Sequence, residues 1–305
     1  MIAYLRHVDI DVRKWNTCIN RSFNATIYAY SWFLDLFSEH WDALVEDDYH
    51  SVMPLFTKRI LGRRIIYTPK AIRELGIFSR DPVPSEKTTQ FLTSIPRRFF
   101  HFHILLNKYN PLEAHWSGNR LVHFSLDLIR PYHKIVENFD VELRRRLNRS
   151  VARQQIFIKG LSPNDLINFI RTRRIPVDHF IRNNHFRILR SLIASLIRNG
   201  TGELVGVYDR HNNLSSAAVF AWINYRIILL FMAVDPRQAE ETPHLFLIDR
   251  IIDRYAETNS ILSFEFLNND LTAEIIRGFG AGESSLMEVT SGKIPFYLRP
   301  FMSLL

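Results

Sequence analysis

The feature of this sequence that most restricts its fold is one order of elements written twice. Residues 41 to 56, WDALVEDDYHSVMPLF, alternate as a strand, turn at an acidic Glu-Asp-Asp and return as a second strand. Residues 202 to 222, GELVGVYDRHNNLSSAAVFAW, repeat this hairpin with a turn at Asp-Arg-His-Asn-Asn. Each hairpin leads to an apolar strand, a helix and a further strand. The repetition predicts two domains of one kind, each with a mixed sheet of its own.

The elements after the two hairpins correspond one by one. We expect the strand, helix and strand at residues 63 to 69, 85 to 99 and 99 to 107 in the first half, and at 225 to 236, 242 to 257 and 261 to 269 in the second. The helix over 242 to 257 has the clearest signals, because Thr242 is suited to the N-cap and Pro243 to the first turn. Its apolar stripe consists of Leu245, Ile248, Ile251, Ile252 and Tyr255.

Helical patterns connect the two halves. A basic helical stretch runs from about residue 132 to 154, one helix begins at the capping residue Ser162, and another covers 185 to 200 and ends at Gly200. The chain is therefore expected to be an α/β (α+β) protein. Its expected parts are an N-terminal domain (1–130), a helical connecting block (131–200) and a C-terminal domain (201–305).

Composition narrows the class of protein. At 47% hydrophobic and 23% charged residues the chain is an ordinary globular protein, and no apolar run approaches the roughly 18 residues of a membrane helix. The charged N-terminus does not resemble a signal peptide, so we expect a cytoplasmic location. Cys18 is the only cysteine, which excludes an intramolecular disulfide and a cysteine-based metal site.

The net charge of +8 indicates an anionic partner, which is a nucleic acid, a phosphorylated small molecule or a membrane surface. Arg145, Arg149 and Arg153 share one helical face by their spacing of four. Such a face is either solvated or binds phosphates. Basic residues cluster at 59 to 64, 95 to 100, 142 to 154 and 171 to 174.

The repeated order of hairpin, strand, helix and strand resembles the GNAT acyltransferase fold. Two copies joined by helices that include RRRLNRSVARQ resemble the FemAB-type branch, the tandem GNAT-like acyl- and aminoacyltransferases. Residues 27 to 35, 41 to 55 and 73 to 79 resemble bacterial chains of the GNAT family. The likeness covers nearly the whole chain. It implies two GNAT-like mixed-sheet domains and transfer of an acyl or aminoacyl group to an amine, on a small or cell-envelope-related acceptor, by direct attack.

The resemblance also implies acyl-CoA as a donor, whose pyrophosphate would lie on backbone N–H groups of a glycine-containing loop. Here this loop covers residues 234 to 244 and contains no glycine, which places CoA in doubt. Glu240 and Glu241 would repel a pyrophosphate, whereas Arg237 and the free N–H groups after Thr242 would offset this repulsion. The residues expected to bind the donor are Val234, Arg237, Thr242 and His244.

FemAB-like proteins often carry a Phe-Glu-Gly-Ser strand, and this chain reads Phe-Glu-Phe-Leu-Asn over 264 to 268. By this resemblance Glu265 is the expected proton acceptor, since a carboxylate among apolar neighbours can remove a proton from an amine. The alternative is that strand alternation simply turns Ser263 and Glu265 to the polar face. Asn268 either caps the next helix or donates a hydrogen bond to a substrate carbonyl.

Aromatic residues offer a candidate substrate wall. Tyr30 and Trp32, together with Tyr28 and Tyr67, either line a cleft between the halves that takes the acceptor or pack as half-buried core residues. His101 and His103 share one strand face but have no third ligand at a useful spacing, so we expect no metal site.

Two further hypotheses follow for the function. The missing glycine loop and the altered Phe-Glu-Gly-Ser strand are compatible with a catalytically inactive GNAT-like protein that binds an anionic ligand or a protein partner. The basic helical face is compatible with an aminoacyltransferase that uses tRNA.

Overall fold

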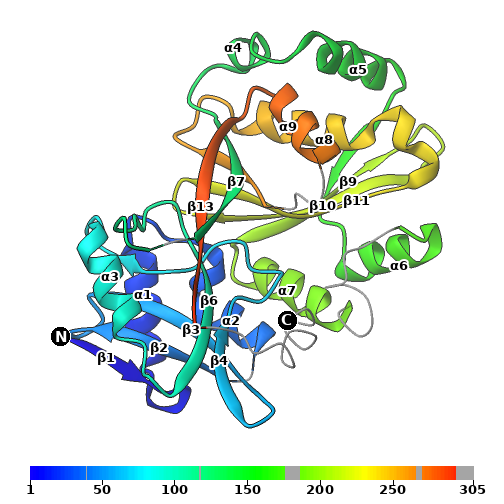
Figure 1. Cartoon of the computed structure of the whole chain (residues 1–305). Helices are drawn as coiled ribbons and strands as arrows, with labels where there is room; N and C mark the ends of the chain where they lie inside the picture. Colours follow the sequence, from blue (N-terminus) through cyan, green and yellow to red (C-terminus); the bar gives the residue numbers. More distant parts are fainter. Residues whose placement is uncertain (39, 117, 176–185, 266–269, 293–305) are drawn as a thin grey trace. The chain divides into compact units, whose positions relative to one another are not determined.

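The computed structural model describes residues 1–38, 40–116, 118–175, 186–265 and 270–292 (Figure 1). The chain divides into two compact units. The first unit contains Met1–Val122 and Ser285–Leu305, and the second contains His123–Ser284. The second unit is thus one continuous stretch inserted between the two parts of the first.

The first unit is built on an extended antiparallel arrangement that ends in one parallel pair. The strands β1 to β4 are antiparallel neighbours in sequence order, and β4 lies parallel to β6. Its strands are β1 (Ile2–Leu5), β2 (Trp41–Glu46), β3 (Ser51–Ile60), β4 (Arg63–Tyr67), β5 (Phe78–Ser79) and β6 (Phe99–Leu106). Its helices are η1 (His7–Asp9), α1 (Val12–Arg21), η2 (Ile27–Ala29), α2 (Ser31–Phe37) and α3 (Ser85–Thr93).

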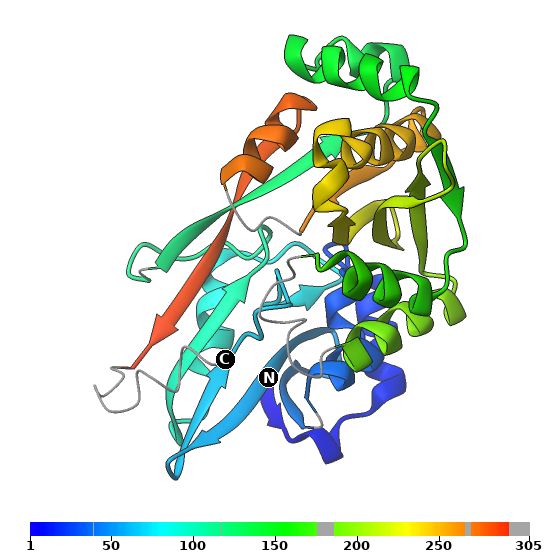
Figure 2. The same cartoon turned by 90° about the vertical axis from the view of Figure 1, so that its right-hand side faces the viewer.

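The second unit repeats this plan and adds helices. The strands β8 to β11 are antiparallel neighbours, and β11 lies parallel to β12. Its strands are β8 (Ile156–Lys159), β9 (Gly202–Tyr208), β10 (Leu214–Ile223), β11 (Arg226–Val234) and β12 (Ile261–Phe264). Its helices are α4 (Tyr132–Val136), α5 (Val141–Ala152), α6 (Pro163–Arg173), α7 (Phe186–Arg198), η3 (Pro236–Glu241), α8 (Pro243–Tyr255) and α9 (Asp270–Gly278). Helix α8 covers one face of β9 to β11, and α6 and α7 lie on the other (Figures 1 and 2).

The repeated order predicted from the sequence is confirmed. Hairpin, strand, helix and parallel strand appear as β2, β3, β4, α3 and β6 in the first half, and as β9, β10, β11, α8 and β12 in the second. The predicted apolar stripe of α8 enters the core of the second unit, where Leu245, Ile248, Ile251 and Ile252 are fully buried. The mixed α/β fold class is therefore confirmed as well.

The two halves exchange their last strands, so that each of these strands pairs with a strand of the other half. Strand β7 (Gly118–Asp127) ends the first half, but its later residues pair with β12, as in Leu126↔Leu262. Strand β13 (Gly282–Ser291) ends the second half and pairs with β6, as in Met287↔Leu106. The expectation of a separate sheet for each half is wrong in this respect. The strands follow one order, β1-β2-β3-β4-β6-β13-β7-β12-β11-β10-β9-β8, with β5 beside β3.

The two units differ from the expected parts 1–130, 131–200 and 201–305. The helical block belongs to the second unit, because α5 packs on α8, β8 pairs with β9, and α7 contacts β9. The residues of β13 from Ser285 onwards belong to the first unit, because they pair with β6. Strand pairing, rather than position along the chain, decides the division.

Most helix signals act as predicted. Ser162 accepts a hydrogen bond from the Asp165 N–H in a complete capping box, and Gly200, at φ 64°, follows the end of α7. Thr242 is an exception. It holds the N-cap position of α8 but its side chain makes no capping bond, because its backbone is left-handed (φ 54°) and a capping side chain needs an extended one. Among the described helices, none combines the length and apolarity that crossing a membrane would require.

Candidate active site

Strand β11 has one edge that is only partly paired. Strand β12 runs beside it in parallel as far as the pair Leu229↔Phe264, whereas β11 itself continues to Val234. On its other edge β11 stays paired with β10 up to Ser216↔Val234. Within the described residues, the last five residues of β11 therefore have a strand on one side only.

A β-bulge marks the place where this edge opens. The pairing of β10 with β11 passes from Val219↔Phe231 to Phe220↔Leu229, so that Leu230 is the extra residue. A bulge bends its strand and increases the local twist. Strands β11 and β12 thus cease to pair next to a bend in β11. From Leu230 onwards most residues of β11 are partly exposed, whereas those before it are buried.

The backbone direction shows which groups reach the open edge. The Asp235 N–H donates to the Ser215 carbonyl, 2.9 Å away, at the end of β10. Since successive residues of a strand turn their N–H and C=O groups to opposite edges, Val234 and Met232 turn theirs away from β10. These two residues place backbone donors and acceptors where an extended ligand can pair with them.

The loop after β11 uses several of its backbone N–H groups within the chain. It is wound into the 3-10 helix η3, in which the Gln238 N–H bonds to the Asp235 carbonyl (2.9 Å) and the Thr242 N–H to the Ala239 carbonyl (3.1 Å). The Arg237 N–H bonds to the Asp235 carboxylate at 3.1 Å. These N–H groups point back into the chain, so they do not converge on an external anion.

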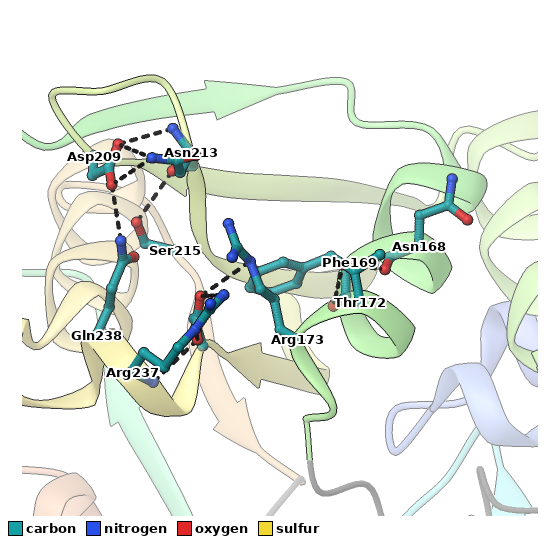
Figure 3. Close-up of polar contacts among 10 residues, drawn as sticks. Asn168, Phe169, Thr172, Arg173, Asp209, Asn213, Ser215, Arg237 and Gln238 are labelled. Atoms are coloured by element: carbon teal, nitrogen blue, oxygen red, sulfur yellow. Dashed lines mark hydrogen bonds and ion pairs between the residues drawn. The ribbon is translucent and has the colours of Figure 1, made fainter.

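Asp235 fixes this loop with two arginines. In Figure 3, Arg173 from α6 and Arg237 from η3 meet at the Asp235 carboxylate, with nitrogen-to-oxygen distances of 3.1 and 3.2 Å. Burial raises the pKa of the Asp235 carboxyl, and the Arg173 charge opposes that shift. Arg237, expected to meet a donor phosphate, is therefore engaged with a carboxylate of its own loop.

A second carboxylate fastens η3 to the β9–β10 hairpin. Asp209 accepts from the Asn213 backbone N–H and from the Gln238 amide, both at 2.8 Å (Figure 3). It also accepts from the His211 backbone N–H at 2.8 Å. Burial would raise the pKa of Asp209, but the hydrogen bonds from Asn213 and His211 outweigh it and lower the pKa. The loop is held at both ends.

His244 lies in the first turn of α8. Its side chain is almost fully buried, and within the described residues its Nδ1 has no hydrogen-bond partner. Burial, together with the positive charge of Arg146, lowers the pKa of His244 to about 4. The ring is therefore a neutral imidazole at physiological pH.

Glu265 lies in a buried polar row. Its Oε1 is 3.3 Å from His123 Nε2 on β7 and 3.8 Å from Arg226 Nη2 on β11. His123 Nδ1 is in turn 3.2 Å from Ser284 Oγ on β13. The Glu265 side chain is only 2% exposed. The sequence predicted the carboxylate but not its partners; Asn268, the substrate-binding candidate beside it, lies outside the described residues.

Strand alternation alone does not describe this row. Ser263 and Glu265 do share a strand face opposite to Phe264, yet both are buried rather than solvated. A single histidine in the apolar run of β7, LVHFSLDL, was the available signal for a buried partner. Its pairing with a residue so far along the chain follows only from the exchanged position of β7.

The aromatic candidates lie in the first unit and have packing contacts. The rings of Tyr30 and Trp32 are stacked with centroids 6.5 Å apart, and the Tyr30 hydroxyl donates to Asn20 at 3.3 Å. The Tyr67 ring is 6.1 Å from that of Phe56. Tyr30, Trp32 and Tyr67 are all half-buried, and burial raises the pKa of both tyrosines.

The two strand histidines have partners within the first unit. His103 Nε2 is 2.6 Å from the Glu288 carboxylate, and His101 Nδ1 is 3.0 Å from the Gly292 carbonyl. In the part of the chain that the structure describes, no group of three or more His, Cys, Asp or Glu side chains is arranged to hold a metal ion.

The sequence and the fold were compared with known proteins. Residues 144–272 match the family model described as an acetyltransferase (GNAT) domain. This segment includes β11, η3, α8 and β12, the elements of the site described above. The comparison with curated proteins gave no match.

Three solved structures share the fold over nearly their whole length. FemX has a TM-score of 0.67 at 10% identity, covering 97% of this chain and 98% of that one. The C-terminal domain of a putative lysylphosphatidylglycerol synthetase from Agrobacterium fabrum has a TM-score of 0.55 at 8% identity, and the match covers 96% of this chain and 95% of that one. A tandem GNAT protein from the clavulanic acid biosynthesis pathway has a TM-score of 0.53 at 8% identity, and the match covers 97% of this chain and 99% of that one.

Residues 144–272 thus match a GNAT acetyltransferase domain, and nearly the whole chain shares the fold of FemX and of the tandem GNAT protein.

Proposed function

We propose that this chain transfers an acyl or aminoacyl group to an amine, with the donor lying along the open edge of β11. The observation that carries the proposal is the parting of β11 and β12 after Leu229↔Phe264. An extended donor placed there would pair with the backbone of Met232 and Val234. Each such hydrogen bond contributes about 1 kcal/mol and fixes the orientation of the reacting carbonyl.

In this proposal Glu265 is the candidate proton acceptor. It immediately follows β12, next to the place where the two strands part. To act as a base, its carboxylate has to reach the attacking amine or a water bound to it. Its contacts with His123 and Arg226 support a second role, in which Glu265 positions β12 against its neighbours. The two roles differ in their effects on activity and stability.

The acceptor is proposed to be related to the cell envelope. This rests on the neighbours of the fold, one of which is named a putative lysylphosphatidylglycerol synthetase, an enzyme named for an aminoacylated membrane lipid. His244 would line the donor side as a neutral group, able to donate or accept one hydrogen bond.

An aminoacyl-tRNA donor is a second candidate, favoured by the state of the loop after β11. The Arg237 and Gln238 N–H groups of η3 bond within the chain, and Glu241 lies at its end, which disfavours a CoA pyrophosphate there. A tRNA places its phosphates farther from the reacting ester. The exposed Arg145 and Arg149 of α5 offer a basic face for such a backbone.

A proline at Val234 tests the open edge. Val234→Pro removes one N–H that does not pair with β10, so the ladder is preserved. Val234→Ala is the matched control, because it shortens the side chain and keeps the N–H. Donor binding is measured by calorimetry with acetyl-CoA, a long-chain acyl-CoA and a panel of aminoacyl-tRNAs. Transfer to amines is followed by mass spectrometry.

The proposal predicts that at least one donor binds the unaltered protein. It also predicts that kcat/KM of Val234→Pro is about tenfold or more below that of Val234→Ala, because one lost hydrogen bond of about 1.4 kcal/mol corresponds to a tenfold change in rate. If both variants transfer equally well, the donor does not lie along this edge. If no donor binds the unaltered protein, the chain is the inactive binding protein instead.

A further inference from the structure

A basic cleft lies in the first unit, on the face of the sheet that also carries α3. It has a volume of about 440 Å³ and forms where β2 and β6 begin, β3 ends and β4 begins. Its lining residues are Tyr4, Arg6, His7, Val8, His40, Asp42, Thr57, Lys58, Arg59, Arg64, Arg98 and Phe99. Such a volume suits a small ligand.

The charges of this cleft are unbalanced. Its lining includes the cations Arg6, Lys58, Arg59, Arg64 and Arg98 and a single carboxylate, Asp42. That carboxylate accepts hydrogen bonds from the Tyr4 hydroxyl and, at 3.1 Å, from the His7 N–H. It is therefore bonded to two neutral donors rather than to an arginine. Arg6 is paired with Asp9 at 3.1 Å, and Lys58 alternates to the other strand face, so Arg59, Arg64 and Arg98 carry the excess positive charge of the cleft.

Two of the arginines face each other directly. Arg59 and Arg64 are Cα partners in the antiparallel pair of β3 and β4. Like charges directly opposite each other destabilise a sheet. Arg59 Nε donates to the Gly62 carbonyl at 3.2 Å, and within the described residues no carboxylate pairs with Arg59, Lys58 or Arg64. An anion between Arg59 and Arg64 would remove the repulsion.

A third arginine is held in place by aromatic rings. The Arg98 guanidinium lies 4.5 Å from the centre of the Tyr4 ring and 5.5 Å from that of Phe99. Stacking on a ring leaves the N–H groups of a guanidinium free in its own plane. Burial and the bond to Asp42 raise the pKa of Tyr4 to about 12, so its hydroxyl stays protonated and neutral. The cleft thus presents ordered donors and a charge that does not vary near neutral pH.

We propose that this cleft binds the phosphate group of a phosphate-ester ligand, at a site separate from the transfer chemistry of β11. Several guanidinium groups around one small volume suit a dianion, since arginine matches phosphate in a bidentate geometry. A small polar molecule or the headgroup of an anionic lipid can supply this phosphate. Val8 beside the cleft and Leu61 at the tip of the β3–β4 hairpin are exposed apolar side chains, which is compatible with a lipid surface next to the cleft.

The first arm of the test uses a soluble probe. Inorganic pyrophosphate is titrated into the whole chain and into Arg64→Gln and Arg98→Gln. Two controls make the same charge change next door. Arg63 alternates to the other strand face, where it lies 5.3 Å from the Phe100 ring, and Arg97 is not among the residues of the cleft. Arg63→Gln and Arg97→Gln should bind as the unaltered chain does, whereas Arg64→Gln and Arg98→Gln should bind about tenfold or more weakly.

The second arm uses vesicles. Co-sedimentation is measured with phosphatidylglycerol vesicles and with phosphatidylcholine vesicles, for the same five proteins. Binding to the anionic vesicles that is lost in Arg64→Gln and Arg98→Gln, and kept in the two controls, assigns the phosphate to a lipid. Pyrophosphate binding with that same dependence and no vesicle binding assigns it to a soluble ester.

The third arm is the stability of the free protein. Because Arg59 and Arg64 repel each other, Arg64→Gln should unfold at a slightly higher temperature than the unaltered chain without ligand, while Arg63→Gln should not. The proposal is wrong if neither probe binds, or if the control variants weaken binding as much as the cleft variants do. Neither result would bear on acyl transfer, which is measured separately with Val234→Pro.

Discussion

His123 on β7 and Glu265, directly after the end of the antiparallel strand β12, lie side by side, with Nε2 and Oε1 3.3 Å apart and both side chains at most 3% exposed. The two residues come from different halves of the chain, and they meet because β7 has taken the place beside β12. Burying a carboxylate is expensive unless it is paired. This contact therefore ties the exchanged strand to the site.

Glu265→Gln is expected to destabilise the protein by roughly 3 kcal/mol, as for other broken buried ion pairs. The amide keeps the shape of the side chain but removes the charge that His123 and Arg226 meet. Urea denaturation at neutral pH measures the change. A change below about 0.5 kcal/mol would mean that the polar row does not hold the strands together.

His123→Gln separates the structural role of Glu265 from a catalytic one. Both variants disturb the same contact, but a base acts only through its own carboxylate. If Glu265 is the proton acceptor, kcat falls about a hundredfold or more in Glu265→Gln and much less in His123→Gln, at temperatures where both are folded. Equal losses in the two variants would assign Glu265 to positioning.

His244 makes stability depend on pH. Its pKa is lowered to about 4 in the folded protein, from 6.5, so the unfolded chain binds more protons between these values. Stability is therefore complete above about pH 6.5 and is lost as the pH falls towards 4, by up to about 3 kcal/mol. His244→Leu should flatten this part of the pH profile of unfolding free energy.

The unaltered chain and His244→Leu are unfolded at each pH under the same conditions, so that the difference between the two profiles reports on His244. Some slope will remain in His244→Leu, because burial also lowers the pKa of His101. A profile identical to that of the unaltered chain would show that His244 is not buried as the structure has it.

Arg173→Gln is expected to loosen η3 by roughly 1–3 kcal/mol, since it removes the closer of the two arginines from buried Asp235. Arg237 is more exposed and remains as a weaker partner. Hydrogen exchange of the amides in 236–241 measures the opening free energy. Arg171→Gln, on the same helix but away from Asp235, is the matched control, and equal exchange in both variants would contradict the prediction.

The basic face of α5 gives a graded prediction for aminoacyl-tRNA. Arg145 is paired with Glu142, with two nitrogen-to-oxygen distances of 2.8 Å, and Arg153 lies 3.9 Å from Glu241. Within the described residues Arg149 makes no ion pair, although its charge also acts on Glu142. Arg149→Gln should therefore lower the slope of log K against log salt by about one, and Arg145→Gln by less. Fluorescence anisotropy between 50 and 200 mM salt, about the range in which such slopes are measured, gives both values. Binding that does not respond to salt would exclude this donor.

The sequence was informative wherever the signal is local. The hairpins, the apolar stripe of α8 and the stop at Gly200 follow from alternation, helical spacing and the tolerance of glycine for positive φ, all within a few residues. The missing glycines after β11 placed a CoA site in doubt, and the Gln238 and Thr242 N–H groups of this loop bond within the chain. What failed locally was the capping role of Thr242, because its left-handed backbone depends on the preceding η3.

The rest depends on pairing between distant segments. Residues 123 and 265 are 142 positions apart, and no periodicity within either strand selects the other as its neighbour. The same limit applies to the basic cleft, where Arg59, Arg64 and Arg98 come from separate segments. Two of the predicted basic clusters, 59 to 64 and 95 to 100, contain arginines of the cleft. The clusters alone do not show that Arg64 faces the cleft and Arg63 does not, because this follows from alternation along the paired strands.

The exchange of β7 and β13 fixes the order in which the protein can mature on the ribosome. The second unit is complete once Ser284 has left the exit tunnel, although its synthesis began later. The first unit, made earlier, waits for the residues after Ser285 before β6 gains its outer neighbour. The part that is translated first is therefore the last to be completed. Until β13 has been made, the unpaired edge of β6 is the place where a nascent chain would need protection from aggregation.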